Sequence, residues 1–534
     1  MSPDVVLIHP PVSLPSEPPV GLGVLAAGLR ARGFEVQLRD ANLDALLRLV
    51  GDVPLGRAGH ARERRALLGR ERALRLLRSA DGYRNLDRYR SAVGGLEETL
   101  RLATSPGTRV GLSNYLELGR SPLRSQDLRA AATEAESSPF APTFEDLADE
   151  LAGSTPRLVG VSVSYLHQAL PAMALCGALR RRLPRARILL GGALLACWRG
   201  RLPPESLQPA VDRLVFGDGL GPLLEELGGA ADDASSAAPL APDYSGVPRT
   251  SYLAPEPIAP VPLSRGCFWG QCRYCPEALA TLDFQPVAPA SIPALLDETR
   301  RLAQADLLHL SDSALSPAAL GALARQRWGA RWYGFTRFAP ALSSAELCSD
   351  LRRSGCLMLQ LGLESGSPRV LQHLRKGIDL EQAARSLERL ADAGIAVFLY
   401  LMFGVPGERR EDALQTLEFV AAHASQITYL NTSLLNLPLR SPAEAELELV
   451  PLSRAGGRGV EGVHDLGLYT GFRHREGWDR RAARRFLERE FARHPEVAEL
   501  LRRSPPVFGA NHAPFLVEAA AGLAGAGASD SMDS

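Results

Sequence analysis

Short apolar runs that alternate with helical segments constrain the fold of this chain most strongly. In the first part of the sequence, strands are predicted at Val5–His9, 35–38, 158–164, 187–190 and 213–216. Helical patterns at 20–32 and 168–183 lie between them. Strands this apolar, joined through helices, are typical of a parallel sheet covered on both faces. We therefore predict an α/β fold that begins with a doubly wound parallel sheet.

The carboxyl ends of these strands are the expected ligand-binding edge, because open α/β sheets bind ligands outside those ends. Small and polar residues occupy this edge. The candidate binding residues are His9, Ser162, Ser164, Gly191, Gly192, Gly217 and Gly219.

An Arg- and Leu-rich stretch, about residues 41–155, interrupts the first alternation with helical spacing. We expect a helical insertion with solvated charged faces. The alternative, that the arginines near 62–90 bind a polyanion, is disfavoured because acidic residues are interspersed among them.

A second strand and helix alternation predicts a full or partial (β/α) barrel, whose chemistry lies at the strand carboxyl ends. Its strands are expected at 307–310, 331–335, 357–361, 397–401 and 427–430. The predicted domains are 1–228, with the insertion at 41–155; a linker at 229–258; the barrel at 259–440; a mainly helical C-terminal extension at 441–518; and a disordered tail at 519–534.

Bulk properties bound the function only loosely. A chain of 534 residues with 46% hydrophobic and 22% charged residues is an ordinary multidomain globular protein. Its formal net charge of zero gives no global electrostatic case for nucleic acid or an anionic membrane. No basic, apolar leader and no apolar run of about 18 residues is seen, so we expect a cytoplasmic protein that binds neither membrane nor nucleic acid.

Three of the seven cysteines, Cys267, Cys272 and Cys275, lie within nine residues on a loop that follows a strand. Three thiolates are fewer than an ordinary iron–sulfur cluster takes, so one iron would stay open for a substrate or cofactor. A zinc site completed by Cys348, Cys356 or a histidine is the alternative. The isolated cysteines, which include Cys176 and Cys197, fit small buried hydrophobic positions.

The segment 264–276 resembles the cluster loop of the radical S-adenosylmethionine (radical SAM) superfamily. The resemblance implies that the three cysteines hold a [4Fe–4S] cluster whose fourth iron is chelated by the methionyl group of S-adenosylmethionine. It also places Tyr274 near the adenine. The loop departs from the usual spacing, because four residues rather than three separate Cys267 from Cys272.

Segments further along resemble the other cofactor-binding motifs of that superfamily. The resemblance assigns Ser311, Asp312 and Ser313 to the second-strand motif near the methionyl amine, Glu364 and Ser365 to the fourth-strand segment near the ribose, and Gly404 and Glu408 to the fifth-strand turn near the adenine. Lys376, the one lysine among 60 Lys and Arg residues, stands where the family commonly has Lys-Gly. Each motif also has an ordinary reading as a turn or a helix cap.

The first domain is similar to the Rossmann-like cobalamin-binding domain found ahead of many radical SAM enzymes, through Gly21, Gly23, Ser162, Ser164 and the Gly191-Gly192 pair. The Asp-x-His-x-x-Gly motif that supplies histidine to cobalt is missing, as it often is in this group. A domain without any cofactor is the alternative.

The resemblance implies reductive cleavage of S-adenosylmethionine to a 5′-deoxyadenosyl radical and cobalamin-dependent methyl transfer to an unactivated carbon. Rearrangement or cyclisation, or a non-catalytic cobalamin- or zinc-binding module, are the alternatives. The implied partners are a small-molecule or peptide substrate and an electron donor such as flavodoxin or ferredoxin. The C-terminal part, around Trp478, Arg480 and 511–515, is expected to close the barrel mouth, with His512 in a core or capping role.

Overall fold

The computed structural model describes residues 2–229, 240–276, 283–441, 447–450, 464–473 and 478–529. The chain divides into two compact units. The front unit comprises residues 1–260, 301–305 and 456–468, and the barrel unit comprises 261–300, 306–455 and 469–534.

The front unit is built on a five-stranded parallel sheet in the order β2-β1-β5-β6-β7. The strands are β1 (Val5–His9), β2 (Val36–Asp40), β5 (Leu158–Ser162), β6 (Arg187–Gly191) and β7 (Arg213–Leu214). The strand order reverses direction between β1 and β5, which makes their carboxyl ends the topological switch point of the sheet. The predicted doubly wound sheet is confirmed.

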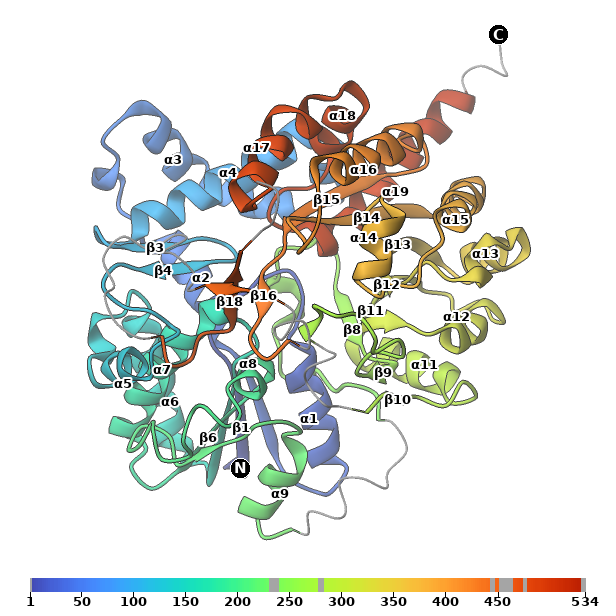
Figure 1. Ribbon diagram of the computed structural model, residues 1–534. Helices are drawn as coiled ribbons and strands as arrows, with labels where there is room; N and C mark the ends of the chain where they lie inside the picture. Colours follow the sequence, from blue (N-terminus) through green and yellow to red (C-terminus); the bar gives the residue numbers. More distant parts are fainter. Residues whose placement is uncertain are drawn as a thin grey trace. The chain divides into compact units, whose positions relative to one another are not determined.

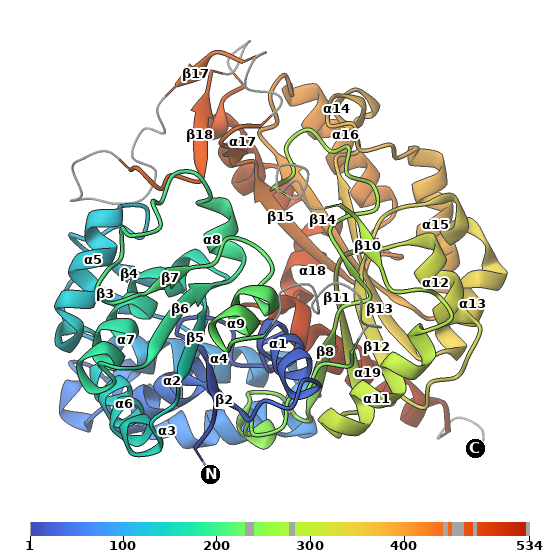
Figure 2. The same cartoon turned by 90° about the horizontal axis from the view of Figure 1, so that it is seen from below.

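Helices cover both faces of this sheet. Figure 2 shows α1 (Val20–Arg30) and α9 (Leu220–Glu226) on one side, with α6 (Ala141–Ser154) and α7 (Ala169–Arg182) on the other. A Cβ at Gly28 would lie 2.8 Å from the side chain of Leu220, so glycine lets α1 approach α9 closely.

Between β2 and β5 the chain is mostly helical. It forms α2 (Ala41–Asp52), α3 (Ala61–Leu77), α4 (Leu86–Ala103) and α5 (Ser125–Thr133) before α6. The sequence pattern did not reveal an antiparallel pair here, β3 (Thr108–Val110) with β4 (Tyr115–Glu117). Strands of three residues are too short to show a period.

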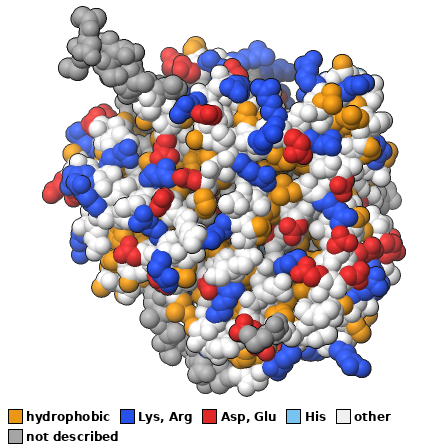
Figure 3. Space-filling view, turned by 180° about the vertical axis from the view of Figure 1, so that it is seen from behind, with side chains coloured by type: hydrophobic (Ala, Val, Ile, Leu, Met, Phe, Trp, Pro, Cys, Tyr) orange, Lys and Arg blue, Asp and Glu red, His pale blue; other side chains and the backbone are white. Residues whose placement is uncertain are grey.

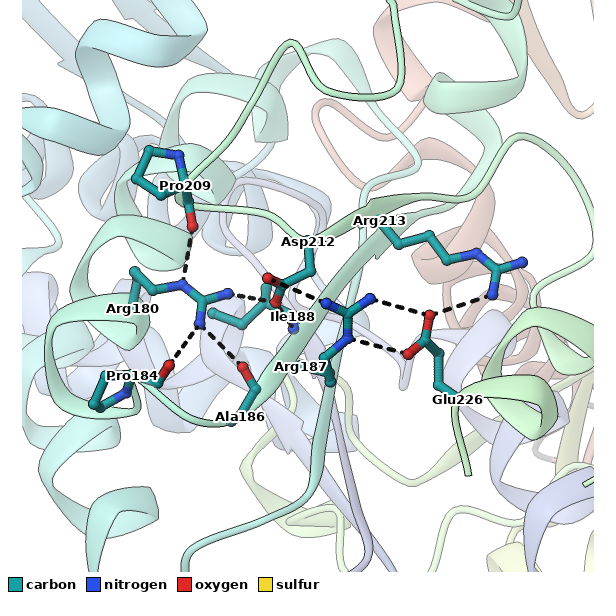
Figure 4. Close-up of polar contacts among 9 residues, drawn as sticks. All are labelled: Arg180, Pro184, Ala186, Arg187, Ile188, Pro209, Asp212, Arg213 and Glu226. Atoms are coloured by element: carbon teal, nitrogen blue, oxygen red, sulfur yellow. Dashed lines mark hydrogen bonds and ion pairs between the residues drawn. The ribbon is translucent and has the colours of Figure 1, made fainter. Parts of the chain in front are cut away.

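An ion-pair network closes the amino-terminal edge of β6 and β7 (Figure 4). Asp212 accepts from Arg180 Nη2 at 2.5 Å and from the backbone N of Ile188 at 2.7 Å. Glu226 of α9 accepts from Arg187 Nε at 3.1 Å and from Arg213 at 3.3 Å. These contacts tie α7, β6, β7 and α9 together at the edge opposite the expected ligand site.

The predicted linker at 229–258 is packed where the structure describes it, from residue 240 onward. Tyr244 is buried against Gly23 of α1, and its hydroxyl donates to Pro260 O at 2.5 Å. Tyr252 is also buried and donates to Asp40 Oδ2 at 2.6 Å. The Pro- and Ser-rich composition thus masked two anchoring tyrosines, and residues 230–239 lie outside the described part.

The barrel unit contains a six-stranded sheet in the order β15-β14-β13-β12-β11-β8, parallel from β11 to β15 (Figure 1). Its strands are β11 (Leu307–Leu315), β12 (Arg331–Thr336), β13 (Cys356–Glu364), β14 (Ala396–Phe403) and β15 (Tyr429–Leu434), and the edge strand β8 (Ile258–Val261) spans the boundary of the two units at residue 260. This open sheet confirms the partial-barrel form of the prediction.

Helices line the outer face of this sheet (Figure 2). They are α11 (Ile292–Ala303), α12 (Pro317–Ala324), α13 (Ala345–Arg353), α15 (Leu380–Asp392) and α16 (Arg410–Ala422), with the short α14 (Pro368–His373) after β13. The other face carries aromatic side chains, including His309 stacked on Tyr333 with centroids 4.6 Å apart, and Phe335 near Tyr400 at 4.9 Å.

The C-terminal part forms α17 (Arg480–Arg489), α18 (Pro495–Arg503) and α19 (Gly509–Ser529), with short antiparallel strands β16 (Leu437–Pro438), β17 (Leu449–Val450) and β18 (Tyr469–Phe472) before them. The predicted disordered tail begins as helix, because α19 continues past residue 519 to Ser529. Alanine, abundant there, is the strongest helix former.

Only part of this extension lies where the barrel mouth was predicted to close. Trp478 donates to Glu408 beyond the carboxyl end of β14. In contrast, Glu518 of α19 pairs at 2.7 Å with Arg331, the first residue of β12, so α19 covers the amino-terminal end of the sheet. His512 is fully buried and stacks on Phe508 at 4.1 Å, which is the predicted core role.

On the face shown in Figure 3, basic and acidic side chains are interspersed, as the balanced composition suggests. Within the described residues, no helix combines the length and apolar character needed to cross a membrane.

Candidate functional site

The loop that carries the three cysteines begins at a buried carboxylate. Asp312 of β11 accepts a hydrogen bond from Leu263 N at 2.9 Å and another from the Ser264 hydroxyl. Burial raises the pKa of Asp312, while the two hydrogen bonds act in the opposite direction. Both carboxylate oxygens therefore hold the start of the loop, so Asp312 positions the cysteines.

Cys267, Cys272 and Cys275 are half-buried and form no disulfide. Gly266 and Gly270 adopt positive φ values of 72° and 60°, which bend the loop on either side of Cys267. Among the described residues, no three His, Cys, Asp or Glu side chains are gathered closely enough to hold a metal ion. The three thiols share one loop but are not gathered at a single point, so binding of one cluster requires them to converge.

The donor set of this loop suits an iron–sulfur cluster. Thiolates are the usual ligands of such clusters, and three of them leave one iron open. The zinc alternative loses its two cysteine candidates, because Cys348 and Cys356 are fully buried in the core. Burial raises the pKa of Cys348 to about 11 and the pKa of Cys356 well above its usual value, which keeps both as thiols.

The segment that follows α14 packs against the cysteine loop and hydrogen-bonds it. Trp269 Nε1 donates to Arg375 O at 2.9 Å, and Arg273 N donates to Leu374 O at 3.1 Å. Gly377, with φ of 64°, lies directly against the Trp269 ring, where any Cβ would overlap the indole. The Lys-Gly pair noted in the sequence therefore supports the cluster loop.

Tyr274 joins the cysteine loop to the fifth-strand turn. Its ring is buried in an apolar cluster with Val370, Leu374 and Val405, and its hydroxyl hydrogen-bonds His373 Nε2 at 2.8 Å. The predicted residues Tyr274 and Gly404 are thereby brought to the same region of the barrel unit.

The middle of β11 carries a polar group without a partner in the described part of the chain. Ser311 Oγ is buried and has no hydrogen bond within the described residues, whereas Ser313 is exposed. A buried hydroxyl normally has a partner, so Ser311 is the second-strand residue best suited to a bound ligand.

At the end of β13, Glu364 adopts a positive φ of 69° and accepts from Lys376 Nζ at 2.7 Å. A Cβ at Gly362 would lie 2.6 Å from the Glu364 carboxylate, so glycine leaves room for this ion pair. Ser365 differs from the predicted cofactor contact: it is fully buried and hydrogen-bonds Thr416 of α16 at 3.1 Å. Its side chain anchors the turn.

The fifth-strand turn encloses a buried acid. Glu408 Oε2 accepts from Gly404 N at 2.5 Å, from Val405 N at 3.2 Å and from Trp478 Nε1 at 3.2 Å. Its Oε1 is buried and has no partner within the described residues. Burial raises the pKa of Glu408 to about 7, against the effect of these hydrogen bonds. A cavity of about 390 Å³ lies beside it, lined by α14 and the Pro406–Glu408 turn.

Arg337, which follows β12, belongs to the site although no motif in the sequence predicts it. Its guanidinium lies over the Trp269 ring at 4.3 Å, its Nη1 lies 3.6 Å from Cys272 Sγ, and its Nη2 donates to Lys376 O. The available signal was its place at the end of the third barrel strand, where the second, fourth and fifth strands carry the predicted motifs.

In the front unit, the predicted edge residues lie at or just beyond the carboxyl ends of β5, β6 and β7. Gln168 fixes the loop after β5, because its Oε1 accepts from Ser164 N at 2.8 Å and its Nε2 donates to Pro10 O at 2.7 Å. His9 is buried, which lowers its pKa, and it bonds Ser13 Oγ at 2.7 Å. His9 therefore stabilises the loop after β1 through a buried hydrogen bond.

The glycines of this edge have distinct roles. Gly192, with φ of 106°, lies against the Val163 backbone, where a Cβ would clash. Gly217 adopts φ of 149° beside Arg199. Gly23 accommodates the Tyr244 ring, so its place in the helix start reflects packing. Ser162, Gly191 and Gly219 are partly exposed at the edge.

Comparison with known proteins agrees with this arrangement. Residues 261–420 match the Radical SAM superfamily. The solved structure of the radical S-adenosylmethionine methyltransferase TsrM from Kitasatospora setae, with tryptophan substrate and a SAM analog, has a TM-score of 0.53 and 15% identity, covering 88% of this chain and 84% of that one. The cobalamin-dependent S-adenosylmethionine radical enzyme OxsB has a TM-score of 0.53 and 12% identity, covering 88% and 64% respectively.

A curated sequence relative is the "Uncharacterized methyltransferase PH0819" of Pyrococcus horikoshii, which is 30% identical over 74 residues. The match spans 14% of this chain and 16% of that protein. A radical SAM domain implies a [4Fe–4S] cluster and S-adenosylmethionine. The chain therefore carries a radical SAM domain at residues 261–420 and has the fold of cobalamin-dependent radical SAM enzymes.

Proposed function

We propose that this protein is a cobalamin-dependent radical SAM methyltransferase that methylates an unactivated carbon of a small molecule or peptide. The observation that carries the proposal is the loop of Cys267, Cys272 and Cys275 within the matched domain. The methyltransferase activity of TsrM and the short match to a methyltransferase support the choice of methyl transfer.

When bound, the cluster would supply the electron that cleaves S-adenosylmethionine to methionine and a 5′-deoxyadenosyl radical, and methylcobalamin would supply the methyl group. The residues of the chain hold and orient these groups. The three cysteines ligate iron, and Ser311 offers its buried hydroxyl to the methionyl amine. The Glu364–Lys376 pair lies at the next motif, toward the ribose.

Tyr274 and the turn from Gly404 to Glu408 form an apolar wall suited to the adenine. In the front unit, we assign the cobalamin to the edge formed by Ser162, Ser164, Gly191, Gly192, Gly217 and Gly219. The assignment is supported by the switch point between β1 and β5, where such a sheet binds ligands.

The test is anaerobic reconstitution of the cluster with added hydroxocobalamin, followed by mass analysis of the products formed from S-adenosylmethionine and a low-potential electron donor such as flavodoxin or ferredoxin. We expect both 5′-deoxyadenosine and S-adenosylhomocysteine. If deoxyadenosine alone forms, the reaction is a rearrangement or cyclisation and not a methyl transfer. If S-adenosylmethionine stays intact, radical chemistry is refuted. Cys272→Ala should abolish both products, while Cys197→Ala, an exposed cysteine of α8 (Ala193–Cys197) in the front unit, should abolish neither.

A further inference from the structure

Arg337 is a buried cation with an unusual set of neighbours. The residue is 6% exposed, yet no carboxylate lies within ion-pair distance of it in the described part of the chain. Its polar contacts are Lys376 O and Cys272 Sγ, and its third neighbour is the Trp269 ring. Buried arginines are normally paired with an anion, because an isolated charge is costly to remove from water.

The geometry fixes where this charge points. Trp269 is itself held by its hydrogen bond to Arg375 O at 2.9 Å, and the carbonyl of Lys376 binds the other end of the guanidinium. With one face on the indole and one nitrogen on a carbonyl, the remaining Nη1 is directed at Cys272 Sγ, 3.6 Å away. A planar guanidinium suits this arrangement, since it stacks on an aromatic ring while donating in its own plane.

A three-cysteine [4Fe–4S] cluster is an anion that could pair with this charge. Its three thiolates outweigh the charge of the iron–sulfur core, and the excess grows when the cluster takes up an electron. Hydrogen bonds and charges at cluster sulfurs set the reduction potential, and a nearby cation favours the more negative, reduced state.

We propose that Arg337 is a positioning residue of the cluster site, which donates an N–H···S hydrogen bond to the Cys272 thiolate and raises the reduction potential of the cluster. The inference rests on the proposed cluster and adds to it a residue that tunes electron uptake. Trp269 and the Lys376 carbonyl hold the guanidinium in place for this role.

The test compares Arg337→Met, which keeps the length but removes the charge, with Arg337→Lys, which keeps the charge but loses the planar fork. Arg325→Met, an exposed arginine at the end of α12, is the matched control. Each protein is reconstituted anaerobically, its iron content is measured, and the cluster is titrated against redox mediators by EPR in the absence of S-adenosylmethionine.

We expect wild-type iron content and a roughly tenfold shift toward the oxidised cluster at fixed applied potential in Arg337→Met, which is about 59 mV more negative for one electron. Arg337→Lys should shift less, and Arg325→Met should not shift. If Arg337→Met fails to hold iron, the smaller shift in Arg337→Lys decides the question.

A full complement of iron with an unchanged potential in both Arg337 variants would overturn the inference. So would a loss of S-adenosylmethionine affinity without a change in potential, because the guanidinium would then serve that ligand. A wild-type protein that binds no iron would instead overturn the proposed function itself.

Discussion

The buried Glu408 makes stability depend on pH in a way that a single substitution can isolate. Its folded-state pKa is about 7, raised by burial from 4.5. The folded state holds the proton of this acid more tightly than the unfolded state does. The resulting contribution to stability is therefore fully present below pH 4.5 and is lost as the pH rises through 7. At about 1.4 kcal/mol per pKa unit, the loss is on the order of 3 kcal/mol, most of it between pH 5 and 7.

Glu408→Gln removes this titration while keeping an oxygen to accept from Gly404 N and Trp478 Nε1. The difference in unfolding free energy, variant minus wild type, should therefore rise by roughly 2–3 kcal/mol from pH 5 to pH 8. Urea unfolding of the apoprotein, followed by tryptophan fluorescence at several pH values, measures it. The exposed Glu411→Gln on the adjoining helix is the control. A difference that stays flat across this range would refute the account of Glu408 as a buried acid.

Two further substitutions test the supports of the site and of the front unit. Gly377→Ala adds a Cβ that overlaps the Trp269 ring at a residue with positive φ. It should lower the free energy of unfolding by roughly 1–3 kcal/mol and reduce the iron bound per chain. Undiminished iron would contradict the role of Trp269 as a support of the loop. Asp212→Asn weakens the contacts to Arg180 and Arg187 at a partly exposed site. Urea unfolding should show a free energy of unfolding lower by about 1–2 kcal/mol, with S-adenosylmethionine binding unchanged. An unchanged free energy would show that the network of Figure 4 contributes nothing measurable to stability.

The two sheets could be predicted from the sequence because their strands are apolar over most of their length. Short apolar runs such as Val5–His9 and 397–401 indicate buried strands. The packed segment at 240–258 could not be predicted, since its Pro- and Ser-rich composition hides the long-range contacts of Tyr244 and Tyr252. Burial of a few aromatic anchors is a tertiary property.

The candidate site was predicted in part. The three cysteines were visible through their spacing alone. Asp312 and Ser365 lie at the motif positions. The side chain of Asp312 binds the start of the cysteine loop, and that of Ser365 binds α16. A motif predicts the position of a residue but not the direction of its side chain. Arg337 carried no motif, and only the structure shows it beside Cys272.

The central claim is that Cys267, Cys272 and Cys275 hold a cluster with one iron open to S-adenosylmethionine. The most direct measurement is electron–nuclear double resonance on the reduced, reconstituted protein with S-adenosylmethionine labelled with ¹⁵N at the methionyl amine. The account predicts about four irons per chain and a hyperfine coupling from the labelled nitrogen that identifies a bond to iron. A cluster whose spectrum does not respond to S-adenosylmethionine, or a protein that binds zinc in place of iron, would contradict it.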